Sequence, residues 1–173
     1  MIKLVIKAKK GDDKAFLKLF QEYEKEIYRI AYIYVKNEND ALDVVQEVAY
    51  RSFKKIDTLK NPEFFKTWLL KIAITCSIDL VRKNKRVVQL NPQYEETLQD
   101  TGVNDISLSI TLQYMIDQLN EDEKSMVILR YYEGYSFKEI ADLLDIPLGT
   151  AKTIFYRAIR KLRHDFKEGD LCE

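Results

Sequence analysis

The sequence predicts an all-α protein of two small helical domains joined by a flexible acidic linker. Only five glycines and three prolines occur in 173 residues, which suits long helices with short connections. Apolar residues recur at helical spacing in several segments, and no segment alternates with the period of a strand. From about Val87 to Ser107 this periodicity is lost and Asn, Pro, Gln, Thr, Asp and Gly collect. We therefore expect domains at 1–88 and 108–173, with the linker at 89–107.

The first domain is expected to contain three helices. Asp12 and Asp13 can cap a helix that begins near Lys14, and its apolar stripe comprises Phe16, Leu19, Phe20, Tyr23, Ile27, Ile30, Ala31 and Tyr34. A second helix follows Asn39 or Asp40, and its inward positions are expected to be Leu42, Val45, Ala49, Phe53 and Ile56. After a short loop at 57–60, Asn61 caps the third helix and Pro62 takes its first position. Its apolar positions are Phe65, Trp68, Leu69, Ile72, Cys76 and Leu80.

The second domain is expected to contain a helix-turn-helix. Helices are predicted at 108–119 and 123–133, and Gly134 closes the second of them. Ser136 and Glu139 have the spacing of a capping box, which opens a short helix that ends near Leu144. A turn at 145–149 leads to a long basic helix from Thr150 to about Phe166. The apolar positions that can lock these last two helices are Ile140, Ala141, Leu144, Ile146, Ala151, Ile154 and Ile159.

Charge is strongly segregated although the net charge is zero. A basic cluster ends the first domain and consists of Arg82, Lys83, Lys85 and Arg86. Residues 87–123 contain eight acidic residues and no Lys or Arg, whereas residues 136–167 contain seven basic and four acidic residues. A helix-turn-helix with a basic second helix favours DNA binding over an ordinary solvated helix, because a helix fits the major groove. Lys152 and Thr153 lie where such a helix presents its first reading residues, while Arg157, Arg160, Lys161 and Arg163 are expected to meet phosphates.

The composition argues against an enzyme, a cofactor, a metal and a small-molecule substrate. His164 is the only histidine, so no Cys/His metal cluster or His-based triad is available, and neither GxxxxGK[ST] nor GxGxxG occurs. Cys76 and Cys172 do not form a disulfide framework, and Cys76 is expected to be a buried core thiol. No apolar run is long enough to span a bilayer and no signal peptide is evident. We expect a cytoplasmic protein that is not itself embedded in a membrane.

Three segments resemble the extracytoplasmic-function branch of the sigma-70 family: DALDVVQEVAYRSFKKI, FFKTWLLKIAITCSIDLVRKNKR and LGTAKTIFYRAIRKLR. The resemblance runs from about Gly11 to Lys167, and three motifs in the right order are more specific than any one of them. It implies two helical domains, called region 2 and region 4, that bind core RNA polymerase and promoter DNA. It also implies a dedicated anti-sigma factor that holds the protein inactive, and cell-envelope stress as the usual setting.

Further roles follow from the resemblance alone. It places polymerase docking in the segment from Asp43 to Ile56, at the residues that match the DxxQE motif: Asp40, Asp43, Gln46 and Glu47. Without the resemblance, an ordinary solvated acidic face would be the better interpretation of these residues. It assigns binding of the −10 element, including capture of an extruded base, to Lys60, Asn61, Thr75, Asp79, Arg82, Lys83, Lys85 and Arg86. Trp68 is assigned to the core and given no role in DNA binding.

The resemblance assigns the −35 element to the helix-turn-helix from Phe137 to Tyr156. The matching residues are Lys152, Thr153, Tyr156 and Arg157, with Arg160 and Lys161 beside them. Ile154 departs from the family, which often has Arg there, so one DNA contact is lost. The acidic linker matches the segment that threads toward the polymerase active-site channel, where its charge can mimic nucleic acid. The main alternative is a DNA-binding regulator without sigma activity, which binds DNA but has no need of core polymerase.

Overall fold

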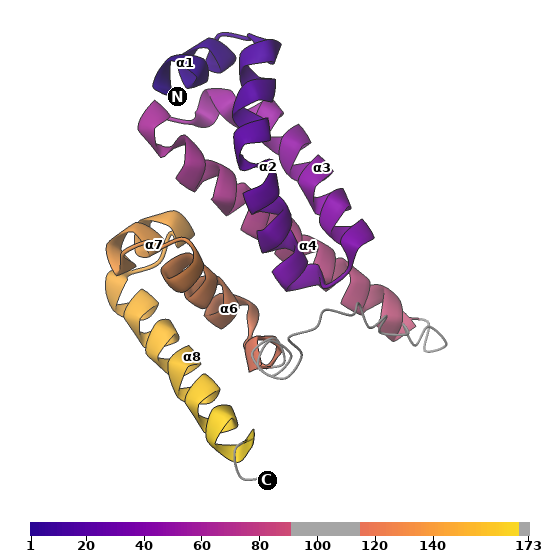
Figure 1. Cartoon of the computed structure of the whole chain (residues 1–173), viewed down its shortest axis with the longest axis vertical. Helices are drawn as coiled ribbons and strands as arrows, with labels where there is room; N and C mark the ends of the chain where they lie inside the picture. Colours follow the sequence, from indigo (N-terminus) through magenta and orange to yellow (C-terminus); the bar gives the residue numbers. More distant parts are fainter. Residues whose placement is uncertain (91–114, 170–173) are drawn as a thin grey trace. The chain divides into compact units, whose positions relative to one another are not determined.

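The computed structural model describes residues 1–90 and 115–169, with side chains at 1–84 and 115–164. These residues form helices and contain no strand, which confirms the all-α prediction. The chain divides into two compact units, Met1–Tyr94 and Glu95–Glu173 (Figure 1). The finer domain boundaries at 88 and 107 stay predictions, and most of the expected linker, together with the helix expected from residue 108 to residue 114, lies outside the described residues.

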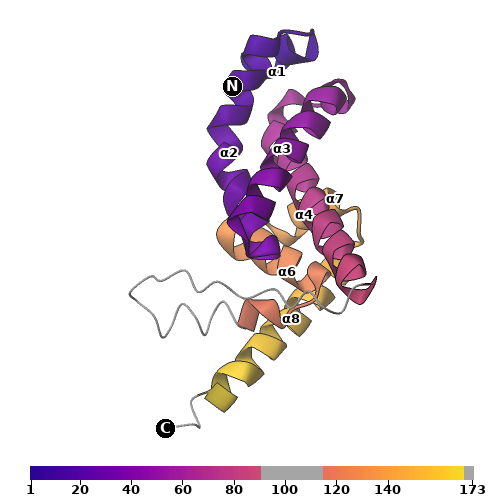
Figure 2. The same cartoon turned by 90° about the vertical axis from the view of Figure 1, so that its right-hand side faces the viewer.

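The first unit is built on three long helices, α2 (Asp13–Val35), α3 (Glu38–Lys55) and α4 (Phe65–Leu90). Each of the three packs against the other two, and both views show them side by side (Figures 1 and 2). Their shared core includes the fully buried Leu19, Ile27, Val48 and Leu69. Burying each such side chain contributes about 1.5–3 kcal/mol. The unit is therefore held by apolar packing.

Helix caps in the first unit follow the predicted pattern with one exception. Asp12 caps α2 by accepting from the Ala15 amide (3.0 Å), and Asn61 accepts from the Glu63 amide (3.0 Å) at the start of η2 (Pro62–Phe64). The cap of α3 is Asn37, whose Oδ1 accepts from the Asp40 amide (3.1 Å). The predicted start after Asn39 or Asp40 was wrong, because Asn37, two residues after the end of α2, supplies the cap. The expected loop after α3 begins with a short helix, η1 (Ile56–Thr58), and α4 continues past Val87 to Leu90.

The inward face of α3 differs from the prediction. Leu42 and Phe53 are 51% and 46% exposed, although both were expected in the core. The residues that α3 buries against α2 and α4 are Ala41, Val44, Val45, Val48 and Ser52. The helix carries two apolar stripes, and spacing alone does not determine which of them the neighbouring helices cover.

A short N-terminal helix, α1 (Ile2–Lys9), was not predicted. Its Val5 and Ala8 are buried, and it packs against α2, η1 and η2. Two buried positions in eight residues are too few to show a helical period, and isolated helices of this length are unstable in water. Tertiary packing therefore stabilises α1.

The second unit contains α6 (Glu121–Val127), the π-helical turn η3 (Ile128–Tyr132), α7 (Phe137–Leu144) and α8 (Leu148–Gly169). Ser136 and Glu139 form the predicted capping box, and Gly134 has the positive φ (71°) of a residue that follows a helix. A second capping box joins Asn120 and Glu123, so that α6 begins two residues earlier than expected. α8 likewise begins at Leu148, before the predicted Thr150. The core between α7 and α8 also uses Leu143, Phe155 and Ala158, which the prediction missed.

Candidate functional site

The outward side of α3 carries a strip of exposed residues, which we call the α3 strip: Leu42, Gln46, Tyr50 and Phe53. These residues follow one another at intervals of four, four and three, so they share one helix face. Tyr50 is 54% exposed, and Lys54 Nζ donates to its hydroxyl (2.5 Å) and lies over its ring. A row of exposed apolar side chains on one helix face is typical of a protein-binding surface. The sequence analysis named Gln46 and placed Tyr50 and Phe53 within the docking segment from Asp43 to Ile56, but it expected Leu42 and Phe53 to face the core. The second apolar stripe was the available signal for their exposure.

The acidic residues of the docking motif lie on a different side of α3, next to α4. Asp40 accepts a hydrogen bond from Asn84 Nδ2 (3.2 Å), and Glu47 accepts one from Arg51 Nε (2.5 Å). Gln46 is rotated from Glu47 by about 100° around the helix. The structure therefore brings Asp40, Asp43 and Glu47 together along one edge and places Gln46 on the neighbouring α3 strip.

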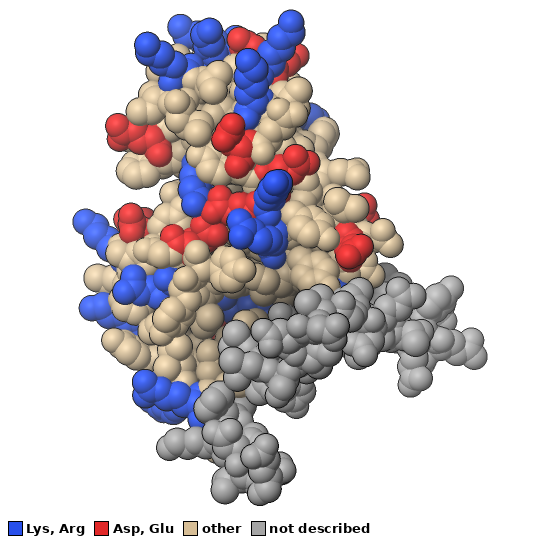
Figure 3. Space-filling view, in the orientation of Figure 1, with Lys and Arg blue, Asp and Glu red and all other residues tan. Residues whose placement is uncertain are grey.

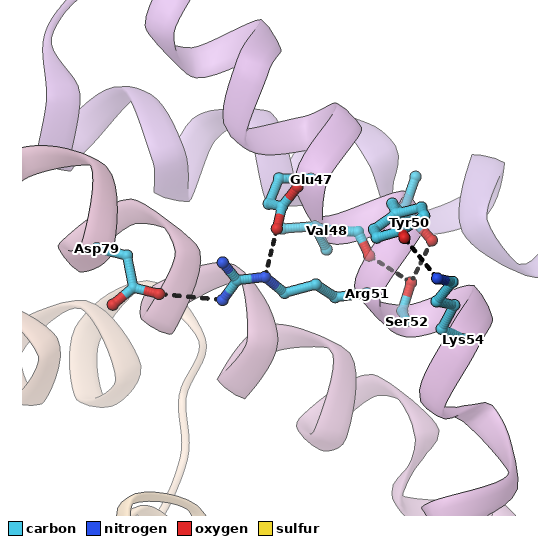
Figure 4. Close-up of polar contacts among 8 residues, drawn as sticks. Glu47, Val48, Tyr50, Arg51, Ser52, Lys54 and Asp79 are labelled. Carbon is cyan, nitrogen blue, oxygen red and sulfur yellow. Dashed lines mark hydrogen bonds and ion pairs between the residues drawn. The ribbon is translucent and has the colours of Figure 1, made fainter. Parts of the chain in front are cut away.

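Arg51 joins α3 to α4 across a groove (Figure 4). Its Nη1 donates to Asp79 Oδ2 (3.0 Å) while its Nε holds Glu47. The groove, with a volume of about 390 Å³, is lined by Asp43, Val44, Glu47, Arg51, Cys76, Asp79, Leu80 and Lys83. Two sets of predicted residues, one for polymerase docking and one for the −10 element, thus meet in a single groove through Arg51.

The ion pairs of Arg51 orient its two carboxylate partners more than they stabilise the fold. Hydrogen bonds to Glu47 and then to Asp79 raise the pKa of Arg51 further above its ordinary value, against the opposing effect of burial. All three side chains remain 34–50% exposed, and ion pairs this open to water contribute less than about 1 kcal/mol to stability. What the two bonds do is fix the direction in which the Glu47 and Asp79 carboxylates point.

The residues predicted to bind the −10 element fall into two groups along α4. Thr75, Asp79, Arg82 and Lys83 occupy two successive turns, and all four are exposed. Lys60 and Asn61 lie at the other end, about 20 Å away along the helix axis at 1.5 Å per residue. The structure therefore does not bring the two groups into one pocket. The side chains of Lys85 and Arg86 lie outside the described residues.

Cys76 is buried beside the groove, as the sequence predicted. Burial raises the pKa of its thiol to about 11, with Arg51 partly opposing the effect. Because only the thiolate is nucleophilic, we expect Cys76 to react with iodoacetamide at pH 8 at least about a hundred times more slowly than free cysteine. Mass spectrometry of the alkylated Cys76 peptide over time measures this rate. A rate close to that of free cysteine would contradict the burial of the thiol.

The outward face of α8 carries the residues predicted to read DNA. Lys152, Thr153, Tyr156 and Arg160 are exposed, and Thr153 Oγ1 donates to the Gly149 carbonyl (2.9 Å). The Tyr156 ring packs against Phe155 (5.5 Å between centroids) and Phe137 (6.2 Å). These contacts hold Tyr156 on the surface with its hydroxyl end available. Ile154, where the family often has Arg, is half-buried, so an apolar residue suits this position.

Glu123, at the start of α6, is fully buried and binds two cations of α8. Arg157 Nε donates to its Oε1 (2.8 Å) and Lys161 Nζ to its Oε2 (2.7 Å). Burial alone would raise the pKa of Glu123, but hydrogen bonds from Lys161, the Asn120 amide and Arg157 outweigh it and lower the pKa. Arg157 and Lys161, both predicted DNA contacts, are thus also fixed to the neighbouring helix. Sequence reasoning missed this role of Glu123, for which the Asn120–Glu123 capping-box spacing was the available signal.

Other features of the described residues bear on the classes of function. The Trp68 ring lies 5.9 Å from that of Phe65 and is half-buried. Within the described part of the chain, no group of three His, Cys, Asp or Glu residues is placed to hold a metal ion. In the same residues, none of the helices combines the length and apolarity that crossing a membrane requires.

Comparisons with known proteins match both units. The family model described as Sigma-70 region 2 matches residues 19–87, and that described as Sigma-70, region 4, matches residues 109–162. The RNA polymerase sigma factor SigV of Bacillus subtilis is 34% identical over 164 residues, covering 94% of this chain and 98% of the relative. The ECF RNA polymerase sigma factor SigW of the same organism is 32% identical, covering 97% and 98%. The sigma factor RpoE of Bartonella quintana, solved with the anti-sigma factor NepR, has a similar fold, with a TM-score of 0.74, 22% identity and coverage of 89% and 98%.

Proposed function

The chain belongs to the extracytoplasmic-function branch of the sigma-70 family, and from this premise we propose how its surfaces divide the work of promoter recognition. It is an RNA polymerase sigma factor and not an enzyme. Its first unit binds core RNA polymerase and the −10 element, and its second unit binds the −35 element. The observation that carries this division is the pair of outward faces, the α3 strip on one unit and the basic face of α8 on the other.

Core polymerase binds the α3 strip together with Asp43. Leu42, Tyr50 and Phe53 supply apolar area and Gln46 supplies hydrogen bonds, the combination found at the centre of protein interfaces. Asp43 lies at the border between this strip and the groove and can pair with a basic group of the polymerase. Asp40 and Glu47 are already bonded within the first unit. They support the surface, and their contribution to binding comes from orienting α3 against α4.

The −10 element binds along α4 as unpaired non-template DNA. Lys60 and Asn61 receive an extruded base at one end, while Thr75, Asp79, Arg82 and Lys83 follow the strand about 20 Å further on. Such a separation corresponds to several nucleotides, so the two groups contact different parts of the strand. Melting is driven by capture of the unpaired bases. Because Arg51 holds both Glu47 and Asp79, docking on polymerase and binding of the strand affect each other through one guanidinium.

The −35 element binds α8 in the major groove. Lys152, Thr153 and Tyr156 read base edges, and Arg160 contacts phosphates, as does the half-exposed Arg157. Each unit alone binds DNA weakly. Core polymerase fixes the spacing between the units and so raises the effective concentration of the second contact. Ile154 replaces a frequent arginine, which lowers the affinity for the −35 element.

We expect Lys152→Ala to reduce −35-dependent transcription about five-fold or more, because one base-reading contact is worth about 1–3 kcal/mol. Nonspecific DNA binding should fall much less, since only one charge is lost. Transcription from templates with an intact or a scrambled −35 element measures the difference. Lys18→Ala, which removes an exposed lysine from α2 in the first unit, is the matched control. Equal losses for Lys152→Ala on both templates would show that Lys152 contacts only phosphates.

The partners and location follow from membership of the family. The protein acts in the cytoplasm with core RNA polymerase and promoter DNA, and an anti-sigma factor holds it inactive by covering these surfaces. The solved sigma factor with a similar fold was crystallised with such a partner. Residues 89–107, which are acidic in sequence, stay predicted as the linker between the two units. Cell-envelope stress is the signal most in keeping with the family.

Run-off transcription with purified core polymerase on genomic fragments tests the proposed function. The protein should direct initiation from defined start points, and it should bind core polymerase when no DNA is present. A DNA-binding regulator without sigma activity would do neither. Binding to DNA without binding to core polymerase would therefore favour that alternative.

A further inference from the structure

A basic surface covers α1, outside the residues assigned to DNA above. α1 precedes residue 19, where the match to Sigma-70 region 2 begins. Lys3 and Lys7 lie one turn apart on the same side of α1, Lys10 directly follows the end of the helix, and α1 contains no Asp or Glu. Figure 3 shows lysine and arginine side chains gathered over this end of the first unit. The surface is therefore suited to a polyanion.

The surface is rigidly attached to the start of the −10 site. Val5 and Ala8 bury the inner side of α1 in the core, and α1 packs against η1 and η2. Lys9 Nζ donates to the carbonyl of Leu59, the residue directly before Lys60 and Asn61. The lysines of α1 thus keep a fixed position relative to the loop proposed to receive the extruded base.

Phe64 adds an aromatic ring to the same place. It lies in η2, three residues after Asn61, and is 59% exposed, whereas the next residue, Phe65, is 2% exposed. The core of the unit therefore does not need the ring of Phe64. Single-stranded DNA is bound by aromatic rings that stack on bases and by a positive surface along the phosphates. Both features meet where α1 packs on η2.

We propose that Lys3, Lys7, Lys10 and Phe64 bind the unpaired non-template strand next to the base held at Lys60 and Asn61. Phe64 stacks on a neighbouring base, and the α1 lysines contact the phosphates that follow. Acidic groups of the same region, Asp12, Asp13, Asp57 and Glu63, are outnumbered by its lysines, which are Lys3, Lys7, Lys9, Lys10 and Lys60. A lipid surface is the weaker alternative, because α1 exposes only Met1, Ile2 and Ile6 as apolar anchors. The proposal rests on the proposed −10 role of the first unit.

The lysines are tested by Lys3→Gln, Lys7→Gln and Lys10→Gln together, in complex with core polymerase. Binding to a fluorescent forked DNA with an unpaired non-template strand is measured by polarisation over a range of KCl concentrations. We expect affinity to fall about tenfold and the slope of log K against log salt to decrease by roughly 2, at about 0.7 per lost phosphate contact. The control is Lys14→Gln, Lys18→Gln and Lys25→Gln, three exposed lysines on one outward face of α2. Equal losses from both triple variants would overturn the proposal.

The ring is tested by Phe64→Ala, which should weaken binding of the forked DNA about tenfold, with Phe64→Trp retaining it. Binding of the Phe64→Ala variant to the fully paired duplex should not change. The control is Tyr132→Ala, which removes an exposed ring from the second unit and should leave binding of the forked DNA unchanged. Unchanged forked-DNA binding by Phe64→Ala, or loss of binding only to anionic phosphatidylserine vesicles in the lysine variant, would overturn the proposal. If the unaltered protein with core polymerase fails to bind the fork, the proposed function itself fails.

Discussion

Changing both Asp43 and Gln46 to lysine is expected to weaken binding to core RNA polymerase by at least about a hundredfold. Gln46 lies at the centre of the α3 strip and Asp43 at its edge, and both are exposed. Two lysines there would have to be desolvated within the interface without partners. Leaving a charge buried and unpaired at an interface costs about 2–5 kcal/mol. The dissociation constant can be measured with labelled sigma factor and core polymerase in the absence of DNA.

The same change should leave the fold intact, because neither side chain contributes to the core. Circular dichroism and the melting temperature of the variant check this. The matched control is Gln21→Lys with Glu22→Lys, which makes the same change in charge at two exposed positions of α2. It should bind core polymerase as the unaltered protein does. If the Asp43 and Gln46 variant keeps its core affinity, the α3 strip is not the docking surface.

Glu123→Ala is expected to lower the free energy of unfolding of the second unit by about 2–3 kcal/mol. The change removes the bond from the Asn120 amide to the Glu123 side chain, worth about 0.5–1.5 kcal/mol, and the buried carboxylate that binds Arg157 and Lys161. The Asn120 cap remains, because Asn120 accepts from the backbone amide of residue 123. Because both cations are about half exposed, they can return to water, which keeps the loss at the lower end of the range for buried pairs. Hydrogen exchange of α8 peptides, read by mass spectrometry on the full chain, measures the effect unit by unit.

Lowering the pH should destabilise the second unit for the same reason, because it protonates the Glu123 carboxylate. The pKa of Glu123 is lowered in the folded state, so its ionisation stabilises the fold above the ordinary value of 4.5. This contribution is lost as the pH falls below that value toward the folded pKa. Glu123→Gln should therefore be less stable than the unaltered protein at pH 7 and show a smaller loss between pH 5 and pH 3.

Glu139→Ala is the control for Glu123→Ala, because Glu139 forms a capping box on the surface without a buried ion pair. It removes only the bond from the Ser136 amide to the Glu139 side chain and should cost about 1 kcal/mol or less. Equal effects of the two substitutions would mean that Glu123 acts only as a cap. A large loss of −35-dependent transcription in Glu123→Ala would further indicate that the buried carboxylate also orients α8 for DNA.

The elements of this protein could be predicted where a local signal is strong. The caps Asp12, Asn61 and Ser136 follow from side chains that bond amides two or three residues away. The buried stripe of α2 follows from spacing alone. The helix-turn-helix and its basic second helix were predicted in the right place, apart from the two residues by which α8 begins early.

Tertiary packing decided what local signals leave open. Leu42 and Phe53 belong to a second stripe of α3 that also carries apolar side chains, and only the positions of α2 and α4 determine that this stripe faces outward. α1 is stable only because Val5 and Ala8 pack into the core of the first unit. Glu123 is separated by 34 and 38 residues from the cations it binds. A chain encodes its helices through contacts between near neighbours, whereas surfaces and buried ion pairs arise from contacts between distant residues, which composition and spacing do not specify.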